Sequence, residues 1–176
     1  NPPWEEVRED ATEFFAVSHP SIANASRRDR PEMIEELAET DPELHAAWRD
    51  EQFKIRKRKH FFNNSPTTQK GSIGKTNTYP LFTFVNSELT NAAGRAGFIV
   101  KTAIATNHDY SSLFRELVTD GRVISMYDFE NVNGYFPGVH RQERFCLLTL
   151  SGSAVPDRSS LELLFNLHSV NDIPDK

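Results

Sequence analysis

The chain has 176 residues, enough for about one domain of ordinary size, and its 38% apolar residues, thirteen Phe among them, can build a core. Its longest apolar runs, AGFIV and FCLLTL, are far shorter than the ~20 residues that cross a bilayer. We therefore expect no membrane partner. The single cysteine excludes an internal disulfide, and the apolar neighbours of Cys146 predict a buried thiol in a reducing compartment.

Residues 5–69 are strongly charged and predict a helical insertion. DATEFFA indicates a helical turn or two, and DRPEMIEELAET a longer helix with Pro31 near its start. A third helix is expected from Asp41, a plausible N-cap followed by Pro42, through HAAWRDEQFKIRKRKHFF. Its apolar residues only approximate a helical period, so its buried face stays open.

Residues 63–76 are rich in Asn, Ser, Thr and Gly and predict a loop, after which helices and short apolar strands alternate. NTYPLFTFVNSELTNA and YSSLFRELVTDG predict helices; GRAGFIVKT, RVISMYDFEN and RFCLLTLSG predict buried strands. This alternation is typical of an α/β sheet, with about three to four strands and helices on both faces. We expect this α/β domain to span residues 70–155, with a linker or a following domain starting in 156–176.

Residues 1–4, Asn1-Pro2-Pro3-Trp4, form a stub with unusual chemistry. The two prolines lack a backbone donor and have a fixed φ, so they favour stiff, extended backbone. Such a stub can present the Asn1 side-chain oxygen and backbone carbonyls to an exocyclic amine, while Trp4 offers a flat face to the ring that carries it. A surface turn with a half-buried tryptophan is the plainer interpretation of the four residues alone.

Later segments add to this stub. Asn1-Pro2-Pro3-Trp4, Tyr79-Pro-Leu-Phe, GRAGFIVKTAIAT, and YDFEN with FPGVHRQERFCLL follow one another in the chain. In this order they resemble the amino-methyltransferases that modify adenine N6 in DNA, and among these the large single-chain enzymes of restriction-modification and related phage-defence systems. The resemblance covers residues 1–4 and about 70–150. It implies the C-terminal half of a Rossmann-like class I methyltransferase sheet, in the cytoplasm of a bacterium or archaeon.

The resemblance also implies roles for individual residues. Residues 1–4 would be the catalytic motif: the Asn1 oxygen and the Pro2 carbonyl accept the N6 hydrogens, with Pro3 stiffening the stub, and Trp4 stacks on an adenine flipped out of double-stranded DNA. Phe136 would be a second wall of the base pocket. A loop aromatic that covers the sheet edge is the alternative interpretation of Phe136.

The methyl donor would be S-adenosylmethionine. In the resembled family its main binding motif precedes the catalytic motif, so its binding residues are unknown in this chain. We therefore expect the chain to be an excerpt of a longer enzyme and to be inactive alone. No metal is expected, because the six histidines are scattered without paired ligand spacing.

KIRKRKHFF carries five basic residues that we expect to contact DNA phosphates: Lys54, Arg56, Lys57, Arg58 and Lys59. A solvated helix end is the alternative interpretation of this segment. Two other functions remain open. One is a methyltransferase that acts on a protein glutamine or on RNA, and the other is a non-catalytic nucleic-acid-binding or interaction module.

Overall fold

The computed structural model describes residues 1–154 and 161–174. The chain divides into two compact units. One consists of Val7–Phe61, and the other combines Asn1–Glu6 with the described residues from Phe62 onward. The first unit lies inside the segment 5–69 that the sequence predicts as a helical insertion.

The first unit is helical. Its elements are α1 (Ala11–Phe15), α2 (Pro20–Asn24), α3 (Arg30–Thr40) and the larger part of α4 (Pro42–Asn64). The predicted N-cap of α4 is confirmed, because the Asp41 side chain accepts a hydrogen bond from Leu44 N at 3.1 Å. The sequence did not predict α2, which has five residues and no side-chain cap.

The helical unit has its own apolar core. Trp48 of α4 packs against Phe15 of α1, with 5.4 Å between the ring centroids. Ile55 lies about two turns after Trp48 and is also buried, whereas Phe53 is 48% exposed. The buried face of α4, which the sequence left open, therefore runs through Trp48 and Ile55.

The second unit is a sheet with three α-helices packed on it. Its longer elements are α5 (Thr78–Leu89), β1 (Arg95–Lys101), α6 (Ala103–Thr106), α7 (Ser111–Thr119), β2 (Val123–Glu130), β3 (Arg144–Ser151) and β4 (Glu162–Leu167). Short 3₁₀ turns lie at Gln69–Gly71, His108–Tyr110, Asn131–Asn133 and Val170–Asp172. The helices and strands predicted for residues 77–152 are confirmed.

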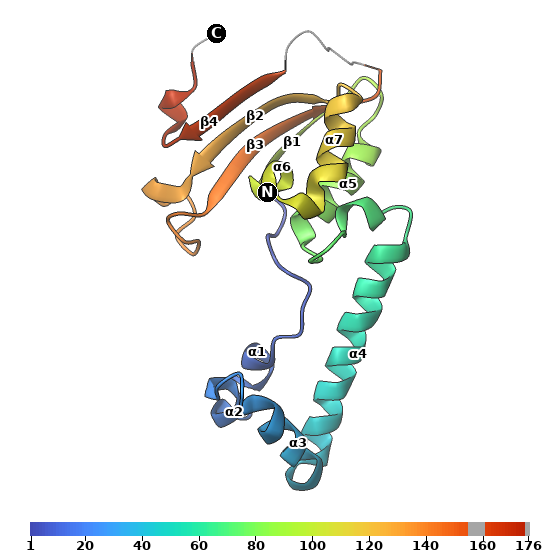
Figure 1. Ribbon diagram of the computed structural model, residues 1–176, viewed down its shortest axis with the longest axis vertical. Helices are drawn as coiled ribbons and strands as arrows, with labels where there is room; N and C mark the ends of the chain where they lie inside the picture. Colours follow the sequence, from blue (N-terminus) through green and yellow to red (C-terminus); the bar gives the residue numbers. More distant parts are fainter. Residues whose placement is uncertain (155–160, 175–176) are drawn as a thin grey trace. The chain divides into compact units, whose positions relative to one another are not determined.

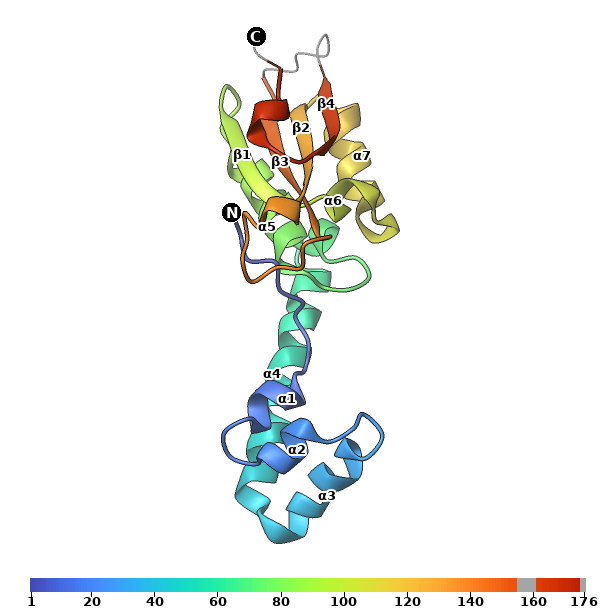
Figure 2. The ribbon, with the colours of Figure 1, turned by 90° about the vertical axis from the view of Figure 1, so that its left-hand side faces the viewer.

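The sheet has the order β1-β3-β2-β4 (Figure 1). Strand β3 lies between β1 and β2 and is antiparallel to both, so β1 and β2 point the same way. Strand β4 is parallel to β2 at the other edge, as the side view shows (Figure 2). The described part of residues 156–176 therefore extends this sheet, in place of the expected linker or following domain.

Helices cover one face of the sheet in the described residues, which corrects the expectation of helices on both faces. Phe98, Val100, Met126 and Leu148 pack with α5, α6 and α7 in one core cluster. Strand residues of the opposite parity form a separate cluster: Ile99, Tyr127, Phe129, Phe145 and Leu147. Aromatic side chains of the stub and of the loop after β2 cover this second face, so no helix is needed there.

Gly121 ends α7 as the sequence predicts. Its φ of +68° is the left-handed conformation that glycine adopts without a Cβ penalty. The Arg122 amide then donates to the Leu117 carbonyl at 2.8 Å, which closes the helix end. The Arg122 side chain in turn donates to the Ser87 carbonyl and ties this turn to α5.

Candidate functional site

The stub of residues 1–4 lies against the sheet. The Trp4 indole is half-buried, and its Nε1 donates to the Ile99 carbonyl of β1 at 3.3 Å. On the other side of Trp4 in the chain, Glu6 forms an isolated antiparallel bridge with Asn77. Residues 4 to 6 are therefore fixed on the sheet unit at two separate points.

Phe136, the predicted second wall, contacts Trp4. Their ring centroids are 4.9 Å apart with planes tilted by 59°, and Phe145 of β3 lies 6.4 Å from Trp4 and 5.0 Å from Phe136. The structure thus brings together two residues that lie far apart in the chain.

The contact leaves no room for a base between Trp4 and Phe136. A planar ring that stacks on both would need their planes about 7 Å apart, twice the ~3.5 Å contact distance. At 4.9 Å the pair is closed. A base can therefore stack on both rings only after one of them moves.

Asn131 holds the loop that carries Phe136. This asparagine is fully buried, accepts a hydrogen bond from Phe136 N at 3.0 Å and donates one to Phe136 O at 3.0 Å. It also donates to the Val139 carbonyl at 3.1 Å. The sequence alone did not single out Asn131 as part of the site. The available signal was a single Asn directly after a predicted strand, where Asn side chains often organise turns.

Two acceptor groups of the stub stay open. Within residues 1–154 and 161–174, neither the Asn1 side chain nor the Pro2 carbonyl forms a hydrogen bond with the protein. The next carbonyl, that of Pro3, accepts from the Thr78 hydroxyl at 2.7 Å. The two oxygens to which the resemblance assigns a catalytic role are therefore available to a ligand.

An apolar cavity of about 250 Å³ lies beside these aromatic rings. Its walls come from β1, β2, β3, the loop after β2 and the last 3₁₀ turn: Ile99, Phe129, Tyr135, Phe136, Phe145, Leu147 and Val170. A flat apolar side chain or ligand group fits walls of this composition. The cavity adjoins Phe136, the ring that closes over Trp4.

A buried carboxylate organises the polar end of the strands. Asp128 is 1% exposed and accepts hydrogen bonds from the Thr102 hydroxyl at 2.6 Å, from the Arg144 guanidinium and from the Asn166 amide. Burial alone would raise the pKa of Asp128, but these hydrogen bonds and the positive charge of Arg144 hold it below its ordinary value of 3.8. Asp128 of β2 therefore links Thr102, directly after β1, with Arg144 of β3 and Asn166 of β4.

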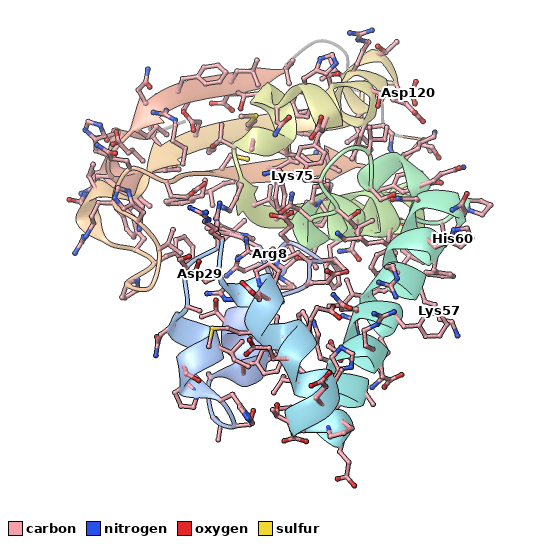
Figure 3. All side chains as sticks on the ribbon, turned by 60° about the horizontal axis from the view of Figure 1, so that its bottom comes forward. Arg8, Asp29, Lys57, His60, Lys75 and Asp120 are labelled. Atoms are coloured by element: carbon pink, nitrogen blue, oxygen red, sulfur yellow. The ribbon has the colours of Figure 1, made fainter. Side chains whose placement is uncertain are left out.

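The basic segment lies on α4 within the helical unit, whereas the stub belongs to the sheet unit. The Lys57 side chain points outward from the helix (Figure 3), with its Nζ 4.4 Å from the Phe53 ring centroid. Among the described residues, Lys54 is the one basic residue of the five with a salt bridge, to Asp50 at 2.8 Å. Arg56 and Arg58 are exposed. The segment therefore presents positive charge to solvent.

Metal-ligand clusters and membrane-spanning helices are both absent from residues 1–154 and 161–174. No three or more His, Cys, Asp or Glu side chains gather there in a way that could hold a metal ion. None of the helices there combines the length and apolarity needed to cross a bilayer.

No protein-family model, curated protein or solved structure matches the chain.

Proposed function

We propose that this chain provides the acceptor side of a site-specific adenine-N6 DNA methyltransferase of the restriction-modification or phage-defence type. One observation carries the proposal: the open oxygens of Asn1 and Pro2 stand next to a tryptophan that is fixed on the sheet and that meets a second aromatic wall, Phe136. The order of β1, β3 and β2, with β2 and β3 as an antiparallel closing pair, supports an assignment to the C-terminal half of a Rossmann-like methyltransferase sheet.

The proposed chemistry uses the stub's two oxygens as acceptors. An exocyclic amine has two N–H donors, and the Asn1 side-chain oxygen and the Pro2 carbonyl are two acceptors without donors among the described residues. When both accept, the amine is held in a fixed orientation and the positive charge that grows on its nitrogen during methyl transfer is stabilised. Once Phe136 has moved away from the indole, Trp4 stacks on the base that carries the amine.

S-adenosylmethionine would supply the methyl group. The junction from β1 to α6 does not fit its binding motif, because it carries Thr102 and Ala103 and no glycine and therefore forms no glycine-rich turn. We therefore assign no residue here to the cofactor. The residues of the stub hold and orient the amine.

Double-stranded DNA is the proposed substrate, and its target adenine would leave the base stack before its amine reached the site. The exposed cations of α4 would neutralise backbone phosphates. Arg56, Lys57 and Arg58 are the strongest candidates, since Lys54 already has a carboxylate partner in Asp50.

The experiment that tests the function uses the full-length protein and methyl-labelled S-adenosylmethionine. We expect label in double-stranded DNA, and N6-methyladenine after digestion to nucleosides. Asn1→Ala is expected to abolish transfer, whereas Asn63→Ala, at an exposed asparagine outside the stub, is the matched control and keeps it.

Three results would overturn the proposal. Transfer by Asn1→Ala at the wild-type rate would reject the role of the stub. Label that appears in a protein glutamine or in RNA and not in DNA would mean that the same acceptor geometry serves another substrate class. DNA binding without label in any acceptor would favour a non-catalytic module.

A further inference from the structure

We infer that Thr78 is a positioning residue for the acceptor site, an inference that rests on the proposed function. Its hydroxyl sets the backbone on both sides of Trp4 and thereby the direction of the neighbouring Asn1 and Pro2 oxygens. Thr78 does not touch the substrate in this assignment. It acts through the stub.

The contacts form a bracket around Trp4. The Thr78 hydroxyl donates to the Pro3 carbonyl at 2.7 Å, and the same oxygen accepts from Glu5 N at 3.0 Å. These two groups belong to the peptides on either side of Trp4. One hydroxyl therefore fixes the peptide before the indole and the peptide after it.

The backbone of Thr78 adds a third bond to the stub. Thr78 is the first residue of α5, where backbone amides have no carbonyl partner within the helix. Its amide donates to the Glu5 carbonyl at 2.9 Å, so a helix-end donor is satisfied by the residue that follows Trp4. Asn77, the N-cap, makes no side-chain cap bond to the helix. This helix end is thus committed to holding residues 3–6.

The indole provides an independent anchor. Trp4 Nε1 bonds to the Ile99 carbonyl of β1, so Trp4 is held from α5 through its backbone and from β1 through its ring. Without the Thr78 hydroxyl, the ring anchor remains while the peptide before Trp4 becomes free to rotate. That rotation moves the Pro2 carbonyl and Asn1, and a displacement of about 1 Å at reacting groups can cost ~100-fold in rate.

The test compares three variants of the full-length protein in steady-state methyl transfer to DNA. Thr78→Val keeps the side-chain shape and removes the hydroxyl; Thr78→Ser keeps the hydroxyl. Thr83→Val is the matched control, because Thr83 lies in the same helix and its hydroxyl bonds to the Tyr79 carbonyl and not to the stub.

We expect Thr78→Val to lower kcat by about 10- to 100-fold while KM for DNA changes less than about threefold, since phosphate contacts supply most of the binding to DNA and the two oxygens mainly orient the amine. Thr78→Ser should restore kcat to within about threefold of wild type. Thr83→Val should leave kcat unchanged even where it lowers stability.

The outcomes separate this inference from the function on which it rests. Equal kcat for Thr78→Val and wild type overturns the inference and leaves the function standing. A parallel loss in Thr83→Val also overturns it, because the effect is then a general weakening of α5. A wild-type protein that methylates no adenine overturns the proposed function, and the role of Thr78 as a positioning residue with it.

Discussion

The Asn131 side chain brackets the Phe136 peptide: its carbonyl oxygen accepts from Phe136 N and its amide donates to Phe136 O, both at 3.0 Å. The Asn131 side chain thus forms the two hydrogen bonds that a backbone residue on a neighbouring strand would form, and Asn131 is wholly buried. These hydrogen bonds fix the backbone of the loop after β2 at Phe136, the residue that carries the aromatic ring. The Phe136 ring therefore meets Trp4 from a rigid base.

Asn131→Asp tests this bracket. An ionised carboxylate cannot donate, so the carbonyls of Phe136 and Val139 are deprived of a donor. We expect the free energy of unfolding to fall by about 1–3 kcal/mol, because two part-buried acceptors lose their donor. Urea denaturation measures the change, with Asn63→Asp at an exposed position as the control. Equal midpoints for the two variants would contradict the assigned role.

Phe136→Ala should uncover the indole. Trp4 and Trp48 are the two tryptophans of the chain, so the experiment is run in a Trp48→Phe background. Removal of the ring 4.9 Å from Trp4 is expected to increase acrylamide quenching of Trp4 and shift its emission to longer wavelength, because water replaces an aromatic neighbour. An unchanged spectrum would show that the two rings do not stay together in solution.

Asp128 predicts a specific acid sensitivity. Because the pKa of its carboxyl is lower in the folded protein than its ordinary value of 3.8, its ionised form stabilises the fold above about pH 4. That stability is lost as the pH falls through the folded-state pKa. Asp128→Asn is therefore expected to be less stable at neutral pH and to show a flatter dependence of unfolding free energy on pH below about 4. Parallel pH curves for variant and wild type would exclude this carboxylate as an acid-sensitive element.

The basic segment predicts a change in salt dependence. Arg56→Glu and Arg58→Glu together should weaken DNA binding and reduce the slope of log affinity against log salt by about 1 for each phosphate that is no longer neutralised. Arg95→Glu together with Arg115→Glu, at exposed positions of β1 and α7, changes the net charge equally and is the control for charge alone. An equal weakening in the control would attribute the effect to net charge rather than to α4.

The backbone conformation of Gly121 predicts that a side chain added at this position destabilises the protein. Gly121→Ala places a Cβ at a φ of +68° and should destabilise the protein by about 1–2 kcal/mol. Gly97→Ala in β1 is the matched control, because a Cβ there meets no atom within 4 Å. Thermal unfolding of both variants measures the difference. Similar midpoints would mean that the turn after α7 adapts without strain.

The local features of the sequence predicted the helices and most strands well, for identifiable reasons. Asp41 with Pro42 marks a helix start, and Gly121 marks a helix end, because each supplies a backbone requirement that few residues meet. Those signals lie within a few residues of the feature they predict. The stub and Phe136 were singled out through chemistry and resemblance, and the structure places the Trp4 and Phe136 rings in contact.

The remaining features depend on partners that are distant in the chain. In the sequence alone, Thr78 is an ordinary first residue of a helix. Only the structure shows that its hydroxyl lies 2.7 Å from the Pro3 carbonyl. Strand β4 depends on its parallel pairing with β2, and no short-range pattern in ELLFNL names that partner. The second face of the sheet was misassigned because its cover consists of single aromatic side chains, which have no period to detect.

The closed Trp4–Phe136 pair has a consequence for ligand binding. Phe136 acts as an intramolecular competitor, since it already occupies part of the indole that a planar guest would use. Aromatic pairs of this kind contribute about 0.5–1.5 kcal/mol, which corresponds to a roughly two- to tenfold reduction of apparent affinity for any guest that must displace the ring. A broad, flat ligand recovers that affinity by stacking on both rings after they separate, whereas a narrow ligand does not.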